Sequence, residues 1–134
     1  MRNMIRVLAP GLLLLAAAGC EGQPISLLNL ELGVDNTGYS VEIVRLASDM
    51  NVTMNLRVIQ GDSVDVRLSP NNDHTSYKSA FSGDQVRERS ASGVLTRGDY
   101  ALRIRESSPR ESAGVKKATV LVQVRGTPTR ALRR

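Results

Sequence analysis

The residues from Asn51 to Ser69 read NVTMNLRVIQGDSVDVRLS, and this stretch decides the expected fold. On either side of Gly61, apolar residues alternate with other residues. The apolar positions are Val52, Met54, Leu56, Val58, Val64, Val66 and Leu68. A period of two is typical of β-strands that bury one face and leave the other in water. Because Gln60-Gly61-Asp62-Ser63 is turn chemistry, the pattern predicts a central β-hairpin over residues 51–69.

The same alternation recurs along the rest of the chain. It is found over residues 28–34, 100–105 and 118–125, with turn sequences at 35–38 and 96–99. No window of 12 or more residues after Cys20 has a convincing 3.6-residue stripe. Aromatic residues make up only 3% of the chain, so the core must come from Val, Leu, Ile and Met. We therefore predict an all-β fold, a single antiparallel β-sandwich of about seven strands.

Some segments are harder to interpret from their pattern. Tyr39, Val41 and Ile43 share one face, after which Val44 and Leu46 take over, which indicates a bulge or a strand that crosses between sheets. Residues 77–81 are expected to form a short strand, and residues 85–92 an edge strand or a loop. Residues 69–76 and 107–114 are loops by composition.

The first twenty residues have the features of an export signal. Two arginines precede an apolar run over residues 7–18, which is too short to span a bilayer. The run ends in Ala17-Ala18-Gly19-Cys20, which resembles the lipobox of bacterial lipoprotein signal peptides. The resemblance implies cleavage before Cys20, diacylglycerol on its thiol and acylation of the new amino group. The alternative is an ordinary secretory signal that leaves Cys20 as an unmodified thiol.

These features divide the chain into four parts. We expect a signal peptide over residues 1–19, a lipidated Cys20 with a short linker over 20–24, a sandwich over 25–126 and a flexible basic tail over 127–134. Loss of Arg2 and Arg6 with the signal lowers the formal net charge from +5 to +3. In the lipoproteins of enteric bacteria that this signal resembles, Asp after the cysteine retains the protein in the inner membrane. Because Glu21 stands there in this chain, the resemblance implies an anchor in the outer membrane, facing the periplasm. The inner membrane and the cell surface remain alternatives.

A second resemblance covers residues 51–125. The strand, glycine turn and valine-rich strand of residues 55–66 are followed by a polar loop at Asn71-Asn72-Asp73 and by Leu95-Thr96-Arg97-Gly98-Asp99-Tyr100-Ala101-Leu102. This order is similar to bacterial prepeptidase C-terminal domains, although the acidic Asp-x-Asp-Leu segment of that family is missing here. The resemblance implies a small jelly-roll-like sandwich.

The sequence offers little for catalysis or metal binding. It has one His and one Cys, which excludes a disulfide framework and an ordinary zinc cluster. His74 follows Asp73 in a polar loop, without a nucleophile-elbow motif nearby, so a solvated loop histidine is the preferred interpretation. Asn71, Asn72, Asp73 and Asp84 lack the spacing of a calcium loop. We predict no catalytic residues, no metal and no cofactor.

Five arginines fall on the outward positions of the expected strands and form a candidate basic binding face: Arg57, Arg67, Arg103, Arg105 and Arg125. Such a face could bind an anionic lipid, an anionic glycan or an acidic envelope protein. The alternative is that these arginines are only solvated and guard strand edges. Nucleic acid is not expected as a partner, since the chain lacks stacking aromatic residues.

Two classes of function follow from these features. The first is a non-catalytic binding or assembly module held at the membrane by a lipid. The second is a small envelope hydrolase or glycan-active enzyme. An inhibitor of a hydrolase, which is itself a kind of binding module, is a further alternative. The shortage of His, Cys and clustered carboxylates favours the binding module. Glu106 and Glu111, which bracket a Ser/Pro loop, are the only close glutamates.

Overall fold

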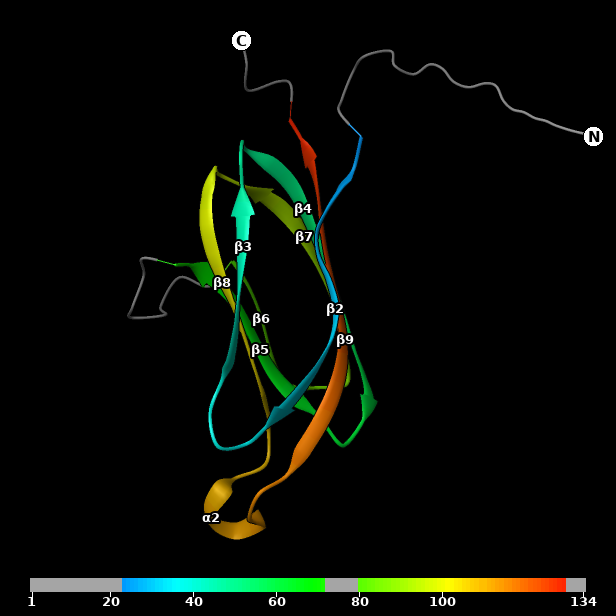
Figure 1. Ribbon diagram of the computed structural model, residues 1–134, viewed down its shortest axis with the longest axis vertical. Coiled ribbons are helices and arrows are strands. Elements are labelled where there is room, and N and C mark those ends of the chain that lie inside the picture. Colours follow the sequence, from blue (N-terminus) through cyan, green and yellow to red (C-terminus); the bar gives the residue numbers. More distant parts are fainter. Residues whose placement is uncertain (1–22, 72–79, 130–134) are drawn as a thin grey trace, which may run out of the picture.

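The computed structural model describes residues 23–71 and 80–129 of the chain. They form eight strands and one short helix, labelled as in Figure 1. The elements are β2 (Ile25–Asp35), β3 (Ser40–Leu46), β4 (Met50–Gln60), β5 (Val64–Pro70), β6 (Phe81–Val86), β7 (Glu88–Leu95), β8 (Gly98–Glu106), α2 (Arg110–Ala113) and β9 (Lys117–Pro128). No helix in this part of the chain is long and apolar enough to cross a membrane.

The strands form two four-stranded sheets. One has the order β2-β9-β4-β7 and is called the β9 sheet below; the other, the β8 sheet, has the order β3-β8-β5-β6. Every strand pair is antiparallel. The two sheets lie face to face in Figure 1 and enclose the apolar core. The predicted all-β sandwich is confirmed, with eight strands rather than about seven.

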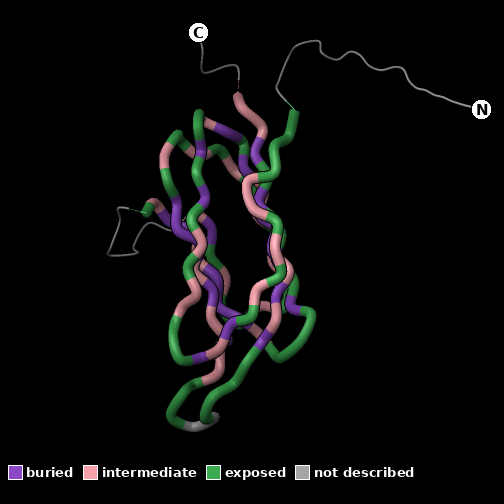
Figure 2. The backbone as a smooth tube through the Cα atoms, in the orientation of Figure 1, coloured by how far each residue is buried: buried purple, intermediate pink, exposed green. Residues whose placement is uncertain are grey.

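Alternation along the strands builds the core. Buried and exposed residues follow one another along β4 and β9, as Figure 2 shows. The inward row of β4 comprises Met50, Val52, Met54, Leu56 and Val58. It faces the inward rows of the β8 sheet, including Val66, Leu68, Leu102 and Ile104. Each fully buried Val, Leu or Ile side chain stabilises the fold by about 1.5–3 kcal/mol relative to an exposed position.

The prediction of a hairpin over residues 51–69 is wrong. β4 pairs with β7 and β9, whereas β5 pairs with β6 and β8, so the turn at Gly61 carries the chain from one sheet to the other. Gly61 has a φ of 99°, and a Cβ atom there would lie 2.7 Å from the carbonyl oxygen of Lys117. The sequence revealed both strands and the turn, but a Gly turn between alternating runs fits an arch between sheets as well as a hairpin.

Neither the bulge nor the crossing between sheets that was expected near Val44 is present. β3 pairs with β8 in continuous register from Ser40 to Leu46. Val44 and Leu46 point into the core, while Val41 and Ile43 occupy the outward side of the same strand with 50% and 39% of their surface exposed. The apolar run without a period-two pattern therefore reflects a strand with apolar residues on both faces.

Other segments differ from expectation in extent. Of the strand expected at residues 77–81, Phe81 begins β6, and residues 77–79 lie outside the described part. Residues 85–86 end β6, residues 88–92 belong to the edge strand β7, and the loop over 107–114 contains α2. Thr127 and Pro128 still pair with β4, and the backbone N–H of Thr129 donates to the Asp49 carbonyl at 3.3 Å. The sandwich therefore includes residues that were assigned to the tail.

The start of β2 and the end of β9 lie together at one end of the sandwich. Ile25 pairs with Gly126, and Met50 pairs with Pro128. Figure 1 shows this arrangement at the top, with α2 at the opposite end. The chain therefore enters and leaves the domain at the same end, away from the middle of either sheet face.

Candidate binding surface

The structure does not bring the five predicted arginines onto one face. Arg57 and Arg125 lie on outward positions of β4 and β9, so they belong to the β9 sheet. Arg67, Arg103 and Arg105 lie on β5 and β8, so they belong to the β8 sheet, on the opposite side of the sandwich. The lipidation candidate Cys20 lies outside the described residues.

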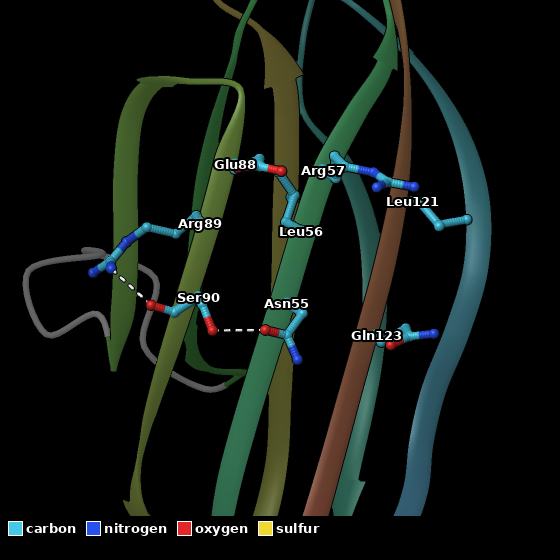
Figure 3. Close-up of a pocket in the computed structure, with 8 residues that line it drawn as sticks. All are labelled: Asn55, Leu56, Arg57, Glu88, Arg89, Ser90, Leu121 and Gln123. Atoms are coloured by element: carbon cyan, nitrogen blue, oxygen red, sulfur yellow. Dashed lines mark hydrogen bonds between the residues drawn. The ribbon is translucent and has the colours of Figure 1, made fainter.

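The outer face of the β9 sheet has a shallow hollow of about 610 Å³. Figure 3 shows the side chain of Arg57 extending from β4 across β9, beside Leu121. Arg57 lies opposite Glu88 on β7 and opposite Leu121 on β9. The hydroxyl of Ser90 donates to Oδ1 of Asn55 at 2.6 Å. The hollow thus combines amide and hydroxyl groups with two arginines, one glutamate and two leucines on adjacent strands.

The outer face of the β8 sheet holds an arginine that is already neutralised. Nε of Arg105 lies 3.2 Å from Oδ2 of Asp65, and its guanidinium carbon lies 4.9 Å from the ring centre of Tyr39. Oδ1 of Asp65 also accepts bonds from the Gln85 N–H at 2.9 Å and the Ser107 hydroxyl at 2.7 Å. Burial alone would raise the pKa of Asp65, but these three donors and the positive charge of Arg105 hold the pKa below its usual value of 3.8.

Arg67 and Arg103 are the unusual pair on this face. They lie directly opposite each other on β5 and β8. Nη1 of Arg103 donates to the hydroxyl of Ser69 at 3.2 Å, and Ser69 itself is fully buried. Like charges placed directly across a sheet destabilise it, in contrast to opposite charges. Among the described residues, neither guanidinium forms an ion pair.

Exposed apolar residues border this arginine pair. Val41 lies opposite Arg103, and Ile43 lies opposite Ala101. β3 is an edge strand, so these two side chains form the outer margin of the sheet face. Below we call Val41, Ile43, Arg67 and Arg103 the β8 face. It offers both apolar area and positive charge.

Two polar residues are buried at the α2 end, and the sequence analysis noted Glu106 only as a neighbour of Glu111 and did not single out Asn36. Asn36 is 5% exposed and Glu106 is 1% exposed. The carboxylate of Glu106 accepts bonds from the backbone N–H of Ser108 at 2.7 Å and from its hydroxyl at 3.0 Å. Glu106 occupies the inward position that follows Ile104 in the alternation of β8, and this position was the one sign in the sequence that the residue is buried.

Arg89 also has a role that its sequence position did not reveal. It lies on the inward side of the edge strand β7, opposite Leu56. Its Nε donates to the Ser82 carbonyl of β6 at 2.9 Å, and its Nη1 donates to the Ser90 carbonyl at 3.0 Å. Arg89 thereby links the two sheets at this side of the sandwich, and an inward charge on an edge strand discourages pairing with another chain.

The described part of the chain contains no group of three or more His, Cys, Asp or Glu side chains that could hold a metal ion. The loop with Asn72, Asp73 and His74 lies outside that part. Asn71 is described, and its backbone N–H donates to the Asp99 carbonyl at 2.9 Å.

No model of a known protein family matches the chain, and no curated protein matches its sequence. Among solved structures, the chain is similar to the pre-peptidase C-terminal domain of collagenase from Bacillus anthracis, with 17% identity and a TM-score of 0.52 over 71% of this chain and 89% of that one. It also matches PliG, a periplasmic inhibitor of g-type lysozyme from Aeromonas hydrophila, with 16% identity and a TM-score of 0.48 over 83% of this chain and 92% of that one. The likeness to the collagenase domain supports the sandwich fold that the prepeptidase resemblance implied.

Proposed function

We propose that this chain is an exported lipoprotein whose sandwich acts as a non-catalytic binding module of the cell envelope. In this proposal the lipid on Cys20 holds the domain at a membrane, with the outer membrane as the first choice. The β8 face then binds an envelope partner.

The position of the chain ends supports the anchoring half of the proposal. Ile25 begins β2 at one end of the sandwich, next to Gly126. The five residues 20–24 that precede Ile25 can span about 18 Å at most. A lipid on Cys20 would hold the domain close to the membrane by its end, which leaves the outer faces of both sheets accessible.

The observation that carries the binding half is the composition of the β8 face. Val41 and Ile43 are 50% and 39% exposed on an edge strand, beside two arginines that face each other. The fully buried centre of an interface is more apolar than the surface around it and is enriched in arginine, whereas lysine and glutamate are depleted there. The outer face of the β9 sheet differs, because six of the eight residues that line its hollow are polar or charged and these include Glu88.

The anchor can be tested by intact-mass measurement of the protein from its own membranes. We expect a chain that begins at Cys20 and exceeds its peptide mass by the mass of the acyl groups. Cys20→Ser should abolish incorporation of labelled palmitate, while Glu21→Gln should leave it unchanged. A mass equal to that of unmodified residues 20–134 would contradict the anchor.

The binding half needs a separate experiment. We would crosslink the protein in cells and compare the crosslinked products of the parent with those of Val41→Ser/Ile43→Ser. The double variant should lose products that the parent forms. Val94→Ser is the matched control, since Val94 is 62% exposed on β7 of the other sheet. If both variants keep every product of the parent, the β8 face is not the binding surface.

A further inference from the structure

The β8 sheet carries one row of outward residues that crosses all four strands. The row runs from Val41 on β3 through Arg103 on β8 and Arg67 on β5 to Ser82 on β6. Side chains directly opposite each other in antiparallel strands have Cβ atoms about 4.5–5.5 Å apart. The two guanidinium groups can therefore reach the same small ligand.

The described carboxylates near this row do not neutralise the arginine pair. Asp65 is engaged by Arg105, and Asp99 lies 3.6 Å from Arg45. Asp84 is exposed on β6, at the place where the register with β5 shifts, and it forms no ion pair with a described residue. Among residues 23–71 and 80–129, Arg67 and Arg103 thus keep two positive charges on facing positions, an arrangement that costs the sheet stability unless an anion joins them.

We infer that Arg67 and Arg103 together bind a doubly charged tetrahedral oxyanion, in the form of an organic phosphate monoester. This inference deepens the proposed function and rests on it, since it names the chemical class recognised by the β8 face. Each guanidinium presents a planar fork of donors that matches phosphate oxygens. A single carboxylate would leave one of the two positive charges uncompensated, whereas a phosphate monoester carries about −1.5 to −2 at pH 7.

The surroundings of the pair favour an ester over the bare ion. The hydroxyl of Ser69 accepts from Arg103 and orients its guanidinium. Val41 is half exposed directly beside Arg103, so the organic part of the ligand can cover apolar surface there. The phosphate can come from a phosphorylated sugar or from a lipid head group, and the experiment below separates these sources.

The test uses the full chain, purified in a nonionic detergent, and follows the arginine Nε–Hε signals by NMR. The probe is glucose 6-phosphate, titrated at constant ionic strength. We expect saturable shifts of the Arg67 and Arg103 signals, with tighter binding at pH 7.5 than at pH 5.5, because the second phosphate pKa is about 6. Sulfate is the control for pH, since its charge stays constant over this range. If the affinities for glucose 6-phosphate and for sulfate changed equally with pH, the inference that the two arginines select a doubly charged anion would be overturned.

Variants assign the effect to the pair. Arg67→Gln/Arg103→Gln should abolish saturable binding, and Arg67→Lys/Arg103→Lys should weaken it roughly tenfold, since the charge stays but the fork is lost. The control is Arg45→Gln, which removes an exposed arginine of the same sheet and should leave the affinity unchanged. The Gln variant should melt close to the parent, because it removes two facing positive charges but also the bond from Arg103 to the Ser69 hydroxyl. If the Gln variant unfolds, the Lys variant provides the test instead. An affinity of the Lys variant for glucose 6-phosphate equal to that of the parent would overturn the inference.

Two further arms identify the source of the phosphate. Phosphatidylcholine vesicles with phosphatidic acid present the group on a lipid, and inorganic phosphate presents it alone. Tighter binding of the vesicles or of the sugar phosphate, lost in the Gln variant, supports the corresponding source. Vesicle or sugar-phosphate binding that is the same in parent and Gln variant overturns the inference. Neither arm involves acylation of Cys20, so failure of the anchor and failure of phosphate recognition are distinguishable.

Discussion

Oδ1 of Asn36 accepts a hydrogen bond from the backbone N–H of Lys116 at 2.9 Å, across 80 residues of sequence. The same side chain donates through Nδ2 to the Gly114 carbonyl at 2.7 Å and to the Ser108 carbonyl at 3.3 Å. Its backbone N–H donates to the Lys116 carbonyl at 3.1 Å. One amide therefore joins the turn after β2 to the segment that carries α2, and it satisfies the backbone of that segment.

Replacing Asn36 with Ala should lower the free energy of unfolding by about 1–3 kcal/mol, because it leaves the backbone partners without their bonds. Asn36→Asp should destabilise more, since a carboxylate would face the Gly114 carbonyl oxygen in place of a donor. Urea unfolding followed by circular dichroism measures both changes. Asn29→Ala is the matched control, because Asn29 is exposed on β2. A loss no larger than that of the control would contradict this role.

Gly61→Ala should be among the most damaging small substitutions in the chain. Its φ of 99° disfavours a side chain, and the new Cβ would lie 2.8 Å from Cα of Ala118. We expect a loss of more than about 2 kcal/mol, seen as a lower midpoint in thermal unfolding. Gly33→Ala serves as the comparison, since a Cβ there meets nothing within 4 Å. Similar melting of the two variants would show that the arch at Gly61 tolerates a side chain.

The stability of the fold should depend on pH through Asp65. Its pKa is lower in the folded chain than the usual value of 3.8, because its hydrogen bonds and Arg105 outweigh the effect of burial. The stabilisation is therefore present above about pH 4 and is lost as the pH falls through the folded-state pKa. Asp65→Asn should make the decline in unfolding free energy between about pH 5 and pH 2 shallower. Asp62→Asn, at an exposed turn, should keep the slope of the parent.

Alternation was sufficient to predict which residues of β4, β5 and β9 enter the core, because one buried face imposes a period of two. It did not determine how the strands pair. The turn at Gly61 is short, and its close approach to Ala118 of β9, where an added Cβ would lie 2.8 Å from Cα, lies outside the local pattern. The prediction for β3 was wrong for a different reason. Val41 and Ile43 face outward, and the spacing of apolar residues alone cannot distinguish an exposed apolar residue from one in the core.

The candidate site was predictable in part for the same reason. The outward positions of Arg67 and Arg103 followed from the alternation of β5 and β8. Their direct apposition depends on the pairing of two strands that are separated by β6 and β7 in sequence. The division of the strands between two sheets also separates this pair from Arg57, which has the same outward position in its strand but lies on the β9 sheet. Asn36 gave only a turn signal, because its partners lie 72 to 80 residues away.

The C-terminal end should divide at Thr129 into a part that stabilises the sandwich and a part that does not. Thr127 and Pro128 pair with Asn51 and Met50, and Thr129 donates to Asp49, so these residues close the end of β9 against β4.

Deleting residues 127–134 from the unlipidated chain 21–134 should therefore lower its melting temperature, whereas deleting residues 130–134 should leave it unchanged. The shorter deletion removes Arg130, Arg133 and Arg134. Each basic residue near an anionic membrane contributes about 1 kcal/mol to binding, and salt screens this attraction. We expect weaker binding to vesicles of anionic lipid at low salt, measured by sedimentation, and a smaller difference at high salt. Equal vesicle binding at low salt by chain 21–134 and by the chain without residues 130–134 would show that the basic tail does not contact the membrane.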